Sequence, residues 1–156
     1  MTEIDRAYPE SFFRGVTSPD AIDRKYMRVL GEAFRFDGNH MYNREYDEIS
    51  INWNDDDNSL VNIKSQKKDE KYKYENGIVS VSTKKIKEMK NRYQNDFSYE
   101  RSPIEGNEYH GNLLLNLSNI SKQLRKSISE ELAVNVDTIY TYNKEEERWT
   151  EYKTEV

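Results

Sequence analysis

Residues 101–117 read R-S-P-I-E-G-N-E-Y-H-G-N-L-L-L-N-L, a polar turn that runs directly into the most apolar stretch of the chain. Pro103 fixes its own φ angle and lacks a backbone donor, while Gly106 and Gly111 allow conformations that other residues avoid. Residues 113–117 read L-L-L-N-L, and such an apolar run is open to strand or helix, of which we favour a buried strand. The turn is therefore predicted to be held on the core by the strand that follows it, an arrangement that often presents binding groups.

The turn also contains the main candidate for catalysis, His110. Imidazole changes charge near neutral pH, so His110 is a candidate general base or substrate ligand, with Glu105 or Glu108 orienting its ring. In the structural alternative, His110 and Asn107 bond backbone groups within the turn, or His110 caps the edge of the core. One histidine beside two carboxylates is a common surface pattern, which favours the structural interpretation.

The spacing P-x-x-x-N-x-x-H from Pro103 to His110 precedes an apolar run, and Phe13-Arg14 lies near the N-terminus. Together these residues resemble a set of small uncharacterised bacterial proteins. The resemblance covers little of the chain. It implies no activity and assigns no catalytic residue.

The composition indicates one domain with an aromatic core. The chain has 156 residues, of which 35% are hydrophobic, and it contains 12 Tyr, 5 Phe and 2 Trp. The absence of cysteine excludes a disulfide scaffold and cysteine-based zinc sites. The first residues show no apolar signal segment, and no run approaches the length of a membrane span, so a cytoplasmic protein is predicted.

Strands and helices are mixed without strict βαβ alternation, which predicts a single α+β domain with a mainly antiparallel sheet and about three helices. The clearest strand is 48–53, E-I-S-I-N-W, with Ile49, Ile51 and Trp53 on one face. Further strands are predicted for residues 10–16, 59–63, 78–82, 97–101 and, at a sheet edge, 137–142. Helices are predicted for residues 19–30, 83–94 and 118–132, with caps at Ser18, Thr83 and Ser118.

The domain is predicted to span residues 1–143, followed by a polar acidic tail at 144–156. This tail is expected either to fray or to act as a peptide in which Trp149 and Tyr152 dock on a partner. Within the domain, residues 64–76 form a charged connection, and the acidic run 54–58 is interpreted as a solvated hairpin turn.

Charge is distributed unevenly along the chain. The formal net charge is −5, but residues 64–92 contain ten basic and four acidic residues, a net +6 that leaves −11 for the rest. Such asymmetry can mark an interaction surface, for which an acidic protein or a nucleic acid is the matching partner. The alternative is a solvated helix face beside a flexible loop. The predicted partner-binding residues are Lys67, Lys68, Lys71, Tyr72, Tyr74, Lys84, Lys85, Lys87 and Trp149.

Signatures of catalysis are sparse. Arg14 lies in a hydrophobic strand, where it is either an anion clamp or a structural residue that faces solvent or an internal ion partner. The chain has two histidines, His40 and His110, without a recognisable ligand motif, so neither a metal nor a cofactor is predicted.

The function favoured by the sequence is a non-catalytic interaction protein: a small cytoplasmic subunit or inhibitor in a bacterial or phage multi-protein system, including defence systems. Richness in Lys, Asn, Tyr and Ile suggests the bacterial or phage origin. The first alternative is a nucleic-acid contact protein that uses the basic segment 64–92. The second is a small enzyme that acts on an anionic, nucleotide-like substrate through Arg14 and His110.

Overall fold

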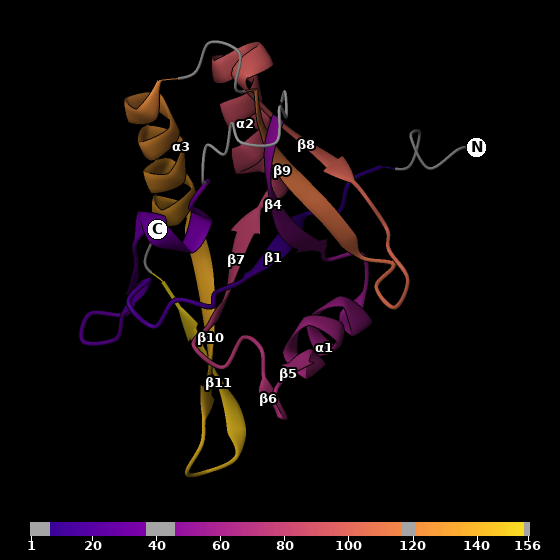
Figure 1. Cartoon of the computed structure of the whole chain (residues 1–156), viewed down its shortest axis with the longest axis vertical. Coiled ribbons are helices and arrows are strands. Elements are labelled where there is room, and N and C mark those ends of the chain that lie inside the picture. Colours follow the sequence, from indigo (N-terminus) through magenta and orange to yellow (C-terminus); the bar gives the residue numbers. More distant parts are fainter. Residues whose placement is uncertain (1–6, 37–45, 117–120, 155–156) are drawn as a thin grey trace.

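The computed structural model describes residues 7–36, 46–116 and 121–154. Its centre is a seven-stranded sheet in which every pair of neighbours is antiparallel, in the order β11-β10-β7-β1-β4-β9-β8 (Figure 1). The strands are β1 (Ser11–Gly15), β4 (Tyr46–Trp53), β7 (Ile78–Ser82), β8 (Phe97–Arg101), β9 (His110–Asn116), β10 (Val136–Asn143) and β11 (Arg148–Lys153). The predicted α+β fold class is confirmed.

Both faces of the sheet are covered. Consecutive residues of a strand point to opposite faces, and Phe12 and Phe13 of β1 are both buried. Phe12 pairs with Trp53 and Phe13 with Asn52, which defines a Trp53 face and an Asn52 face. As predicted, Ile49, Ile51 and Trp53 lie together on one face.

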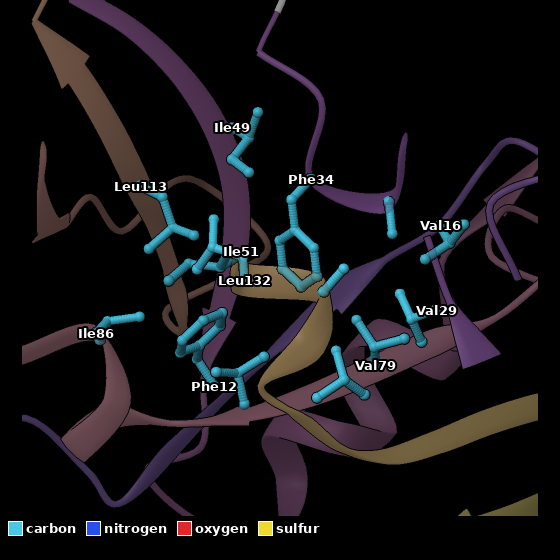
Figure 2. Close-up of a cluster of buried hydrophobic side chains, with 14 of the residues drawn as sticks. Phe12, Val16, Val29, Phe34, Ile49, Ile51, Val79, Ile86, Leu113 and Leu132 are labelled. Atoms are coloured by element: carbon cyan, nitrogen blue, oxygen red, sulfur yellow. The ribbon is translucent and has the colours of Figure 1, made fainter. Parts of the chain in front are cut away.

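The Trp53 face carries the larger core, part of which is shown in Figure 2. It is covered by α2 (Thr83–Tyr93), α3 (Lys122–Val134) and the short 3-10 helix η2 (Gly31–Phe34). Ile86 and Met89 of α2 are buried in this core.

The caps of these helices differ from the predicted ones. The Ser82 hydroxyl, and not that of Thr83, accepts a bond from the Lys84 N–H at the start of α2. At the start of α3, the Ser121 hydroxyl accepts from the Leu124 N–H, and the predicted cap Ser118 lies outside the described residues.

The Asn52 face is covered by α1 (Asp57–Ser65), where the sequence predicted a strand at 59–63. That prediction and the predicted acidic hairpin turn at 54–58 are wrong. The Asp56 carboxylate accepts a bond from the Asn58 N–H and caps a helix. Ser59 and Ile63, one turn apart, then point to the sheet and are buried.

The helix predicted for residues 19–30 is also wrong. The segment forms a hairpin of β2 (Ile22–Asp23) and β3 (Arg28–Val29). The Asp23 carboxylate accepts from the N–H groups of Lys25 and Tyr26, and this local turn competes with a helix. Met27 closes the turn with a positive φ of 48°.

The C-terminal segment is part of the sheet. β10 was predicted as an edge strand, but it lies between β7 and β11. β11 occupies the edge where a separate acidic tail was expected, because Trp149 packs its ring on Tyr142 of β10 and on Tyr72. Tyr72 belongs to a small hairpin of β5 (Lys67–Lys68) and β6 (Lys71–Tyr72), which forms within the charged connection 64–76.

Candidate functional site

Arg14 and His110 lie on opposite faces of the sheet. Arg14 follows Phe13 in β1, so its side chain projects on the Trp53 face. There its Nε donates to the carbonyl of Ala33 at 3.1 Å. Its Nη1 donates to the carbonyl of Ser50 at 2.8 Å. His110 is the cross-strand partner of Asn52 and lies on the other face. The two residues thus do not converge on one substrate.

Both ring nitrogens of His110 have partners. Nδ1 lies 2.7 Å from the carbonyl oxygen of Ser102 and Nε2 lies 3.2 Å from the hydroxyl of Ser50. A carbonyl oxygen only accepts, so Nδ1 carries the proton of that bond and a neutral ring presents its Nε2 lone pair to Ser50. His110 is therefore oriented by Ser102 and not by Glu105 or Glu108.

The neighbouring acids have other positions. Glu105 lines a hollow on the Asn52 face together with His110. Glu108 is exposed and lies near the hydroxyl of Tyr109, which donates to Asp56 at 2.8 Å. The bond to Asp56, followed by burial and Glu108, raises the pKa of Tyr109 well above its usual value.

A network of buried and half-buried amides holds the polar turn to the sheet and to α1. Asn107 donates to the side-chain oxygen of Asn52 at 2.8 Å, and Asn52 donates to that of Asn62 at 3.0 Å. Gln66 donates to the same oxygen of Asn62 at 3.2 Å. Sequence reasoning missed Asn52; its polar amide within the strand E-I-S-I-N-W was the available signal.

The hollow beside this network has a volume of about 280 Å³. Its lining includes Ser50, Lys73, Tyr74, Glu105, Asn107 and His110. The ring of Tyr74 lies against Gly15, where any side chain would overlap it. The sheet, the turn and the 64–76 connection thus each form part of the wall.

Beyond the hollow, aromatic rings and a lysine gather on the same face. This aromatic–lysine cluster consists of Lys64, Tyr72, Tyr140, Tyr142 and Trp149. The Lys64 ammonium lies 5.1 Å from the centre of the Tyr140 ring and 5.8 Å from that of Trp149. Burial lowers the pKa of Lys64, against a smaller opposing effect of Glu151. Burial, with Glu151 and Asp137, raises the pKa of Tyr140 to about 12.

The predicted partner-binding residues separate into two groups. Lys67, Lys68, Lys71 and Tyr72 lie on the β5–β6 hairpin, near Tyr74 and Trp149 on the Asn52 face. Lys84, Lys85 and Lys87 lie on α2, which packs on the Trp53 face. The sheet therefore divides the basic segment 64–92, and the structure does not form one continuous patch from it.

Another concave surface lies on the Trp53 face. This apolar groove, of about 720 Å³, runs between the β2–β3 hairpin, the end of α3 and β11. Three large side chains in its lining are unusually exposed: Tyr26 at 68%, Val134 at 74% and Tyr152 at 42%. Arg28 and Glu130 add opposite charges to the same lining.

β11 forms the edge of the sheet beside this groove, and the β10–β11 hairpin extends beyond the helices (Figure 1). The Thr154 N–H donates to the carbonyl of Asp137, which marks a hydrogen-bonded pair. Because such pairs alternate in an antiparallel ladder, Trp149, Glu151 and Lys153 direct their backbone groups away from β10. Within the described residues, no strand pairs with this outer edge.

Residues 7–36, 46–116 and 121–154 contain no group of three or more His, Cys, Asp or Glu side chains placed to hold a metal ion. Within these ranges, no helix has both the length and the apolar character needed to cross a membrane. Comparisons with protein-family models, curated protein sequences and solved structures found no match. The resemblance to small bacterial proteins stays a prediction.

Proposed function

We propose that the protein is an interaction protein that binds an extended segment of a partner protein along β11. The observation that carries this proposal is the open edge of β11 directly beside the apolar groove. The role of a small cytoplasmic subunit or inhibitor in a bacterial or phage assembly belongs to the same proposal.

The edge and the groove supply different parts of the recognition. Backbone groups of Trp149, Glu151 and Lys153 can pair with a partner strand, as in recognition by strand addition. Alternate side chains of that strand then face the groove beside Tyr152. Large apolar side chains at these alternate positions would cover Tyr26 and Val134, which are otherwise left in water.

The charges on β11 are consistent with a selective edge. Arg148, Glu151 and Lys153 are exposed along it, and charged side chains discourage unspecific pairing between sheet edges. A cognate segment would carry opposite charges at the facing positions. A nucleic acid fits this surface less well, because Glu145, Glu146 and Glu147 precede the strand.

The groove is tested by matched valine variants in quantitative affinity capture from the native cell. Val134→Ser removes an apolar contact in the groove, and Val61→Ser makes the same change on α1, where Val61 is 60% exposed. Loss of one buried valine side chain costs about 1.5–3 kcal/mol, or roughly 10- to 150-fold in affinity. We expect one stoichiometric protein to be lost from Val134→Ser and retained by Val61→Ser.

The edge is tested by Glu151→Pro. Proline removes an N–H that points away from β10, so the β10–β11 pairing survives while the partner loses one backbone bond. Loss of one such bond costs about 1 kcal/mol, roughly fivefold in affinity. Equal retention of the partner by Glu151→Pro, Val134→Ser and the wild-type protein would contradict the proposal. An edge-to-edge dimer abolished by Glu151→Pro would instead identify a second copy as the occupant.

A further inference from the structure

We infer that Ser50 and His110 form a nucleophile–base pair that transfers small acyl groups from esters to water. This site lies on the Asn52 face, apart from the groove and edge of the proposed binding function, and it goes beyond that function. The geometry that carries it is the ring of His110 held between Ser102 and Ser50, at the wall of the 280 Å³ hollow.

The distances are those of an activated nucleophile. Ser50 Oγ lies 3.2 Å from His110 Nε2, and the opposite nitrogen lies 2.7 Å from the Ser102 carbonyl. An activated hydroxyl requires a base within hydrogen-bond reach and a third group that orients the base. The Ser102 carbonyl supplies that third group and fixes the tautomer in which Nε2 can accept the proton of Ser50.

The fold holds this pair in place. Ser50 pairs with Asn112, and Asn52 pairs with His110. Ser50 and His110 are therefore diagonal neighbours on the adjacent strands β4 and β9. Asn107 bonds to Asn52, and the N–H of Ser102 donates to the carbonyl of His110 at 2.9 Å. These bonds fix the backbone of the turn and of β9 around His110, so the imidazole is positioned before a substrate binds.

Ser50 is exposed and opens into the hollow, so a substrate can reach it. The hollow is slightly smaller than most ligand pockets, which selects a small acyl group. Lys73 also lines the hollow and supplies a positive charge that can stabilise a carbonyl oxygen as it becomes negative. Tyr74 supplies an apolar wall against which the acyl chain can lie.

The reaction needs only the ester and water. Ser50 Oγ attacks the acyl carbon as its proton moves to His110 Nε2; the ester C–O bond then breaks and the leaving alcohol takes that proton. Water next attacks the acyl-serine while giving a proton to Nε2, and that proton returns to Ser50 Oγ as the acid leaves. One ester and one water thus give one acid and one alcohol.

The first test is labelling with a fluorophosphonate, in which the serine oxygen bonds to phosphorus and fluoride leaves. We expect one adduct, located by peptide mass spectrometry at Ser50 and absent from Ser50→Ala. His110→Gln should lower the labelling rate at least 100-fold. Ser98→Ala, which removes a hydroxyl from the same face of β8, should leave the rate unchanged. Absence of an adduct at Ser50, or a rate independent of His110, would overturn the inference.

A second measurement keeps the inference testable if His110→Gln does not fold. The chain has no cysteine, so Ser50→Cys and Ser98→Cys each carry a single thiol. A base beside the thiol raises its thiolate fraction. We expect Ser50→Cys to react with iodoacetamide at pH 7 at least tenfold faster than Ser98→Cys. Equal rates would show that His110 does not act as a base toward position 50. Neither assay needs a partner protein, so its outcome is independent of the binding proposal.

Discussion

The ion pair between Arg101 and Asp55 gives the sharpest test of what holds the sheet together. Arg101 lies at the end of β8 and Asp55 follows β4, and their side chains are only 9% and 7% exposed. Two parallel bonds of 2.9 and 2.8 Å join the guanidinium to the carboxylate. The same guanidinium donates to the Ala7 carbonyl at 3.0 Å and lies 5.3 Å from the centre of the Tyr8 ring.

We expect Arg101→Met to lower the free energy of unfolding by about 3–5 kcal/mol. The magnitude follows from burial: the substitution takes the guanidinium away while the Asp55 carboxylate stays buried, and this costs more than the net value of the pair. The double variant Arg101→Met/Asp55→Leu should recover much of the loss, because it leaves neither charge buried.

Urea unfolding followed by tryptophan fluorescence measures these differences, with the urea dependence checked for each variant. Arg148→Met is the matched control, because Arg148 and Glu146 form an ion pair whose side chains are 67% and 53% exposed. Loss of that exposed pair should change the free energy of unfolding by less than about 1 kcal/mol. If Arg101→Met cost no more than Arg148→Met, or if the double variant were no better than the single one, the burial argument would be refuted.

Three other changes test the packing and the surface. Gly111→Ala should lower the free energy of urea unfolding by at least about 2 kcal/mol, because the added methyl would overlap the buried indole of Trp53 in β4. Gly106→Ala has free space around it, so only its φ of 83° should cost about 1–2 kcal/mol in the same assay. Burial alone would raise the pKa of Glu131, but bonds from Arg92 and Tyr93 lower it. The ionised Glu131 therefore stabilises the folded protein, and this stabilisation is lost as pH falls through the lowered pKa. Tyr93→Phe removes one of the two bonds, so the variant should unfold at a higher pH than the wild-type protein in an acid titration.

The strands that were predicted from sequence are those in which period and burial agree. Residues 48–53 alternate because one face of β4 meets the larger core, and the structure buries Ile49, Ile51 and Trp53 there. β7 begins with two successive apolar residues because both of its faces are covered, with Ile78 in one core and Val79 in the other.

The failures arise where a side chain bonds to the nearby backbone. Ile22, Tyr26 and Val29 have helical spacing, yet the Asp23 carboxylate folds the segment into a hairpin and leaves Tyr26 in water. Asp56 has the opposite effect, because its carboxylate caps a helix over residues that look like a strand. Asp23 and Asp56 are the same residue type, so propensity alone could not separate a turn from a cap.

The polar turn was located correctly in sequence, but its chemistry was assigned to the wrong neighbours. Glu105 and Glu108 are adjacent to His110 in the chain, whereas the groups that hold its ring come from β4 and from the end of β8. Register between strands determines which side chains meet, and it can be read from a sequence only once the neighbouring strands are known. The pairing of β4 with β9 is therefore what places Ser50 and Asn52 beside His110.

The tyrosines assigned to a partner have an internal use that changes where a partner should be sought. Tyr72, Tyr142 and Trp149 pack on one another and fasten the charged 64–76 connection to the sheet, with Lys64 over the neighbouring ring of Tyr140. Lysine over an aromatic ring lets a polar segment cover an apolar face, because its stem is apolar and its charge is attracted to the ring. Part of the aromatic enrichment of this chain thus builds a second core on the Asn52 face. Tyr26, Val134 and Tyr152 remain in water at the groove beside β11, and that edge is where partner contacts should first be sought.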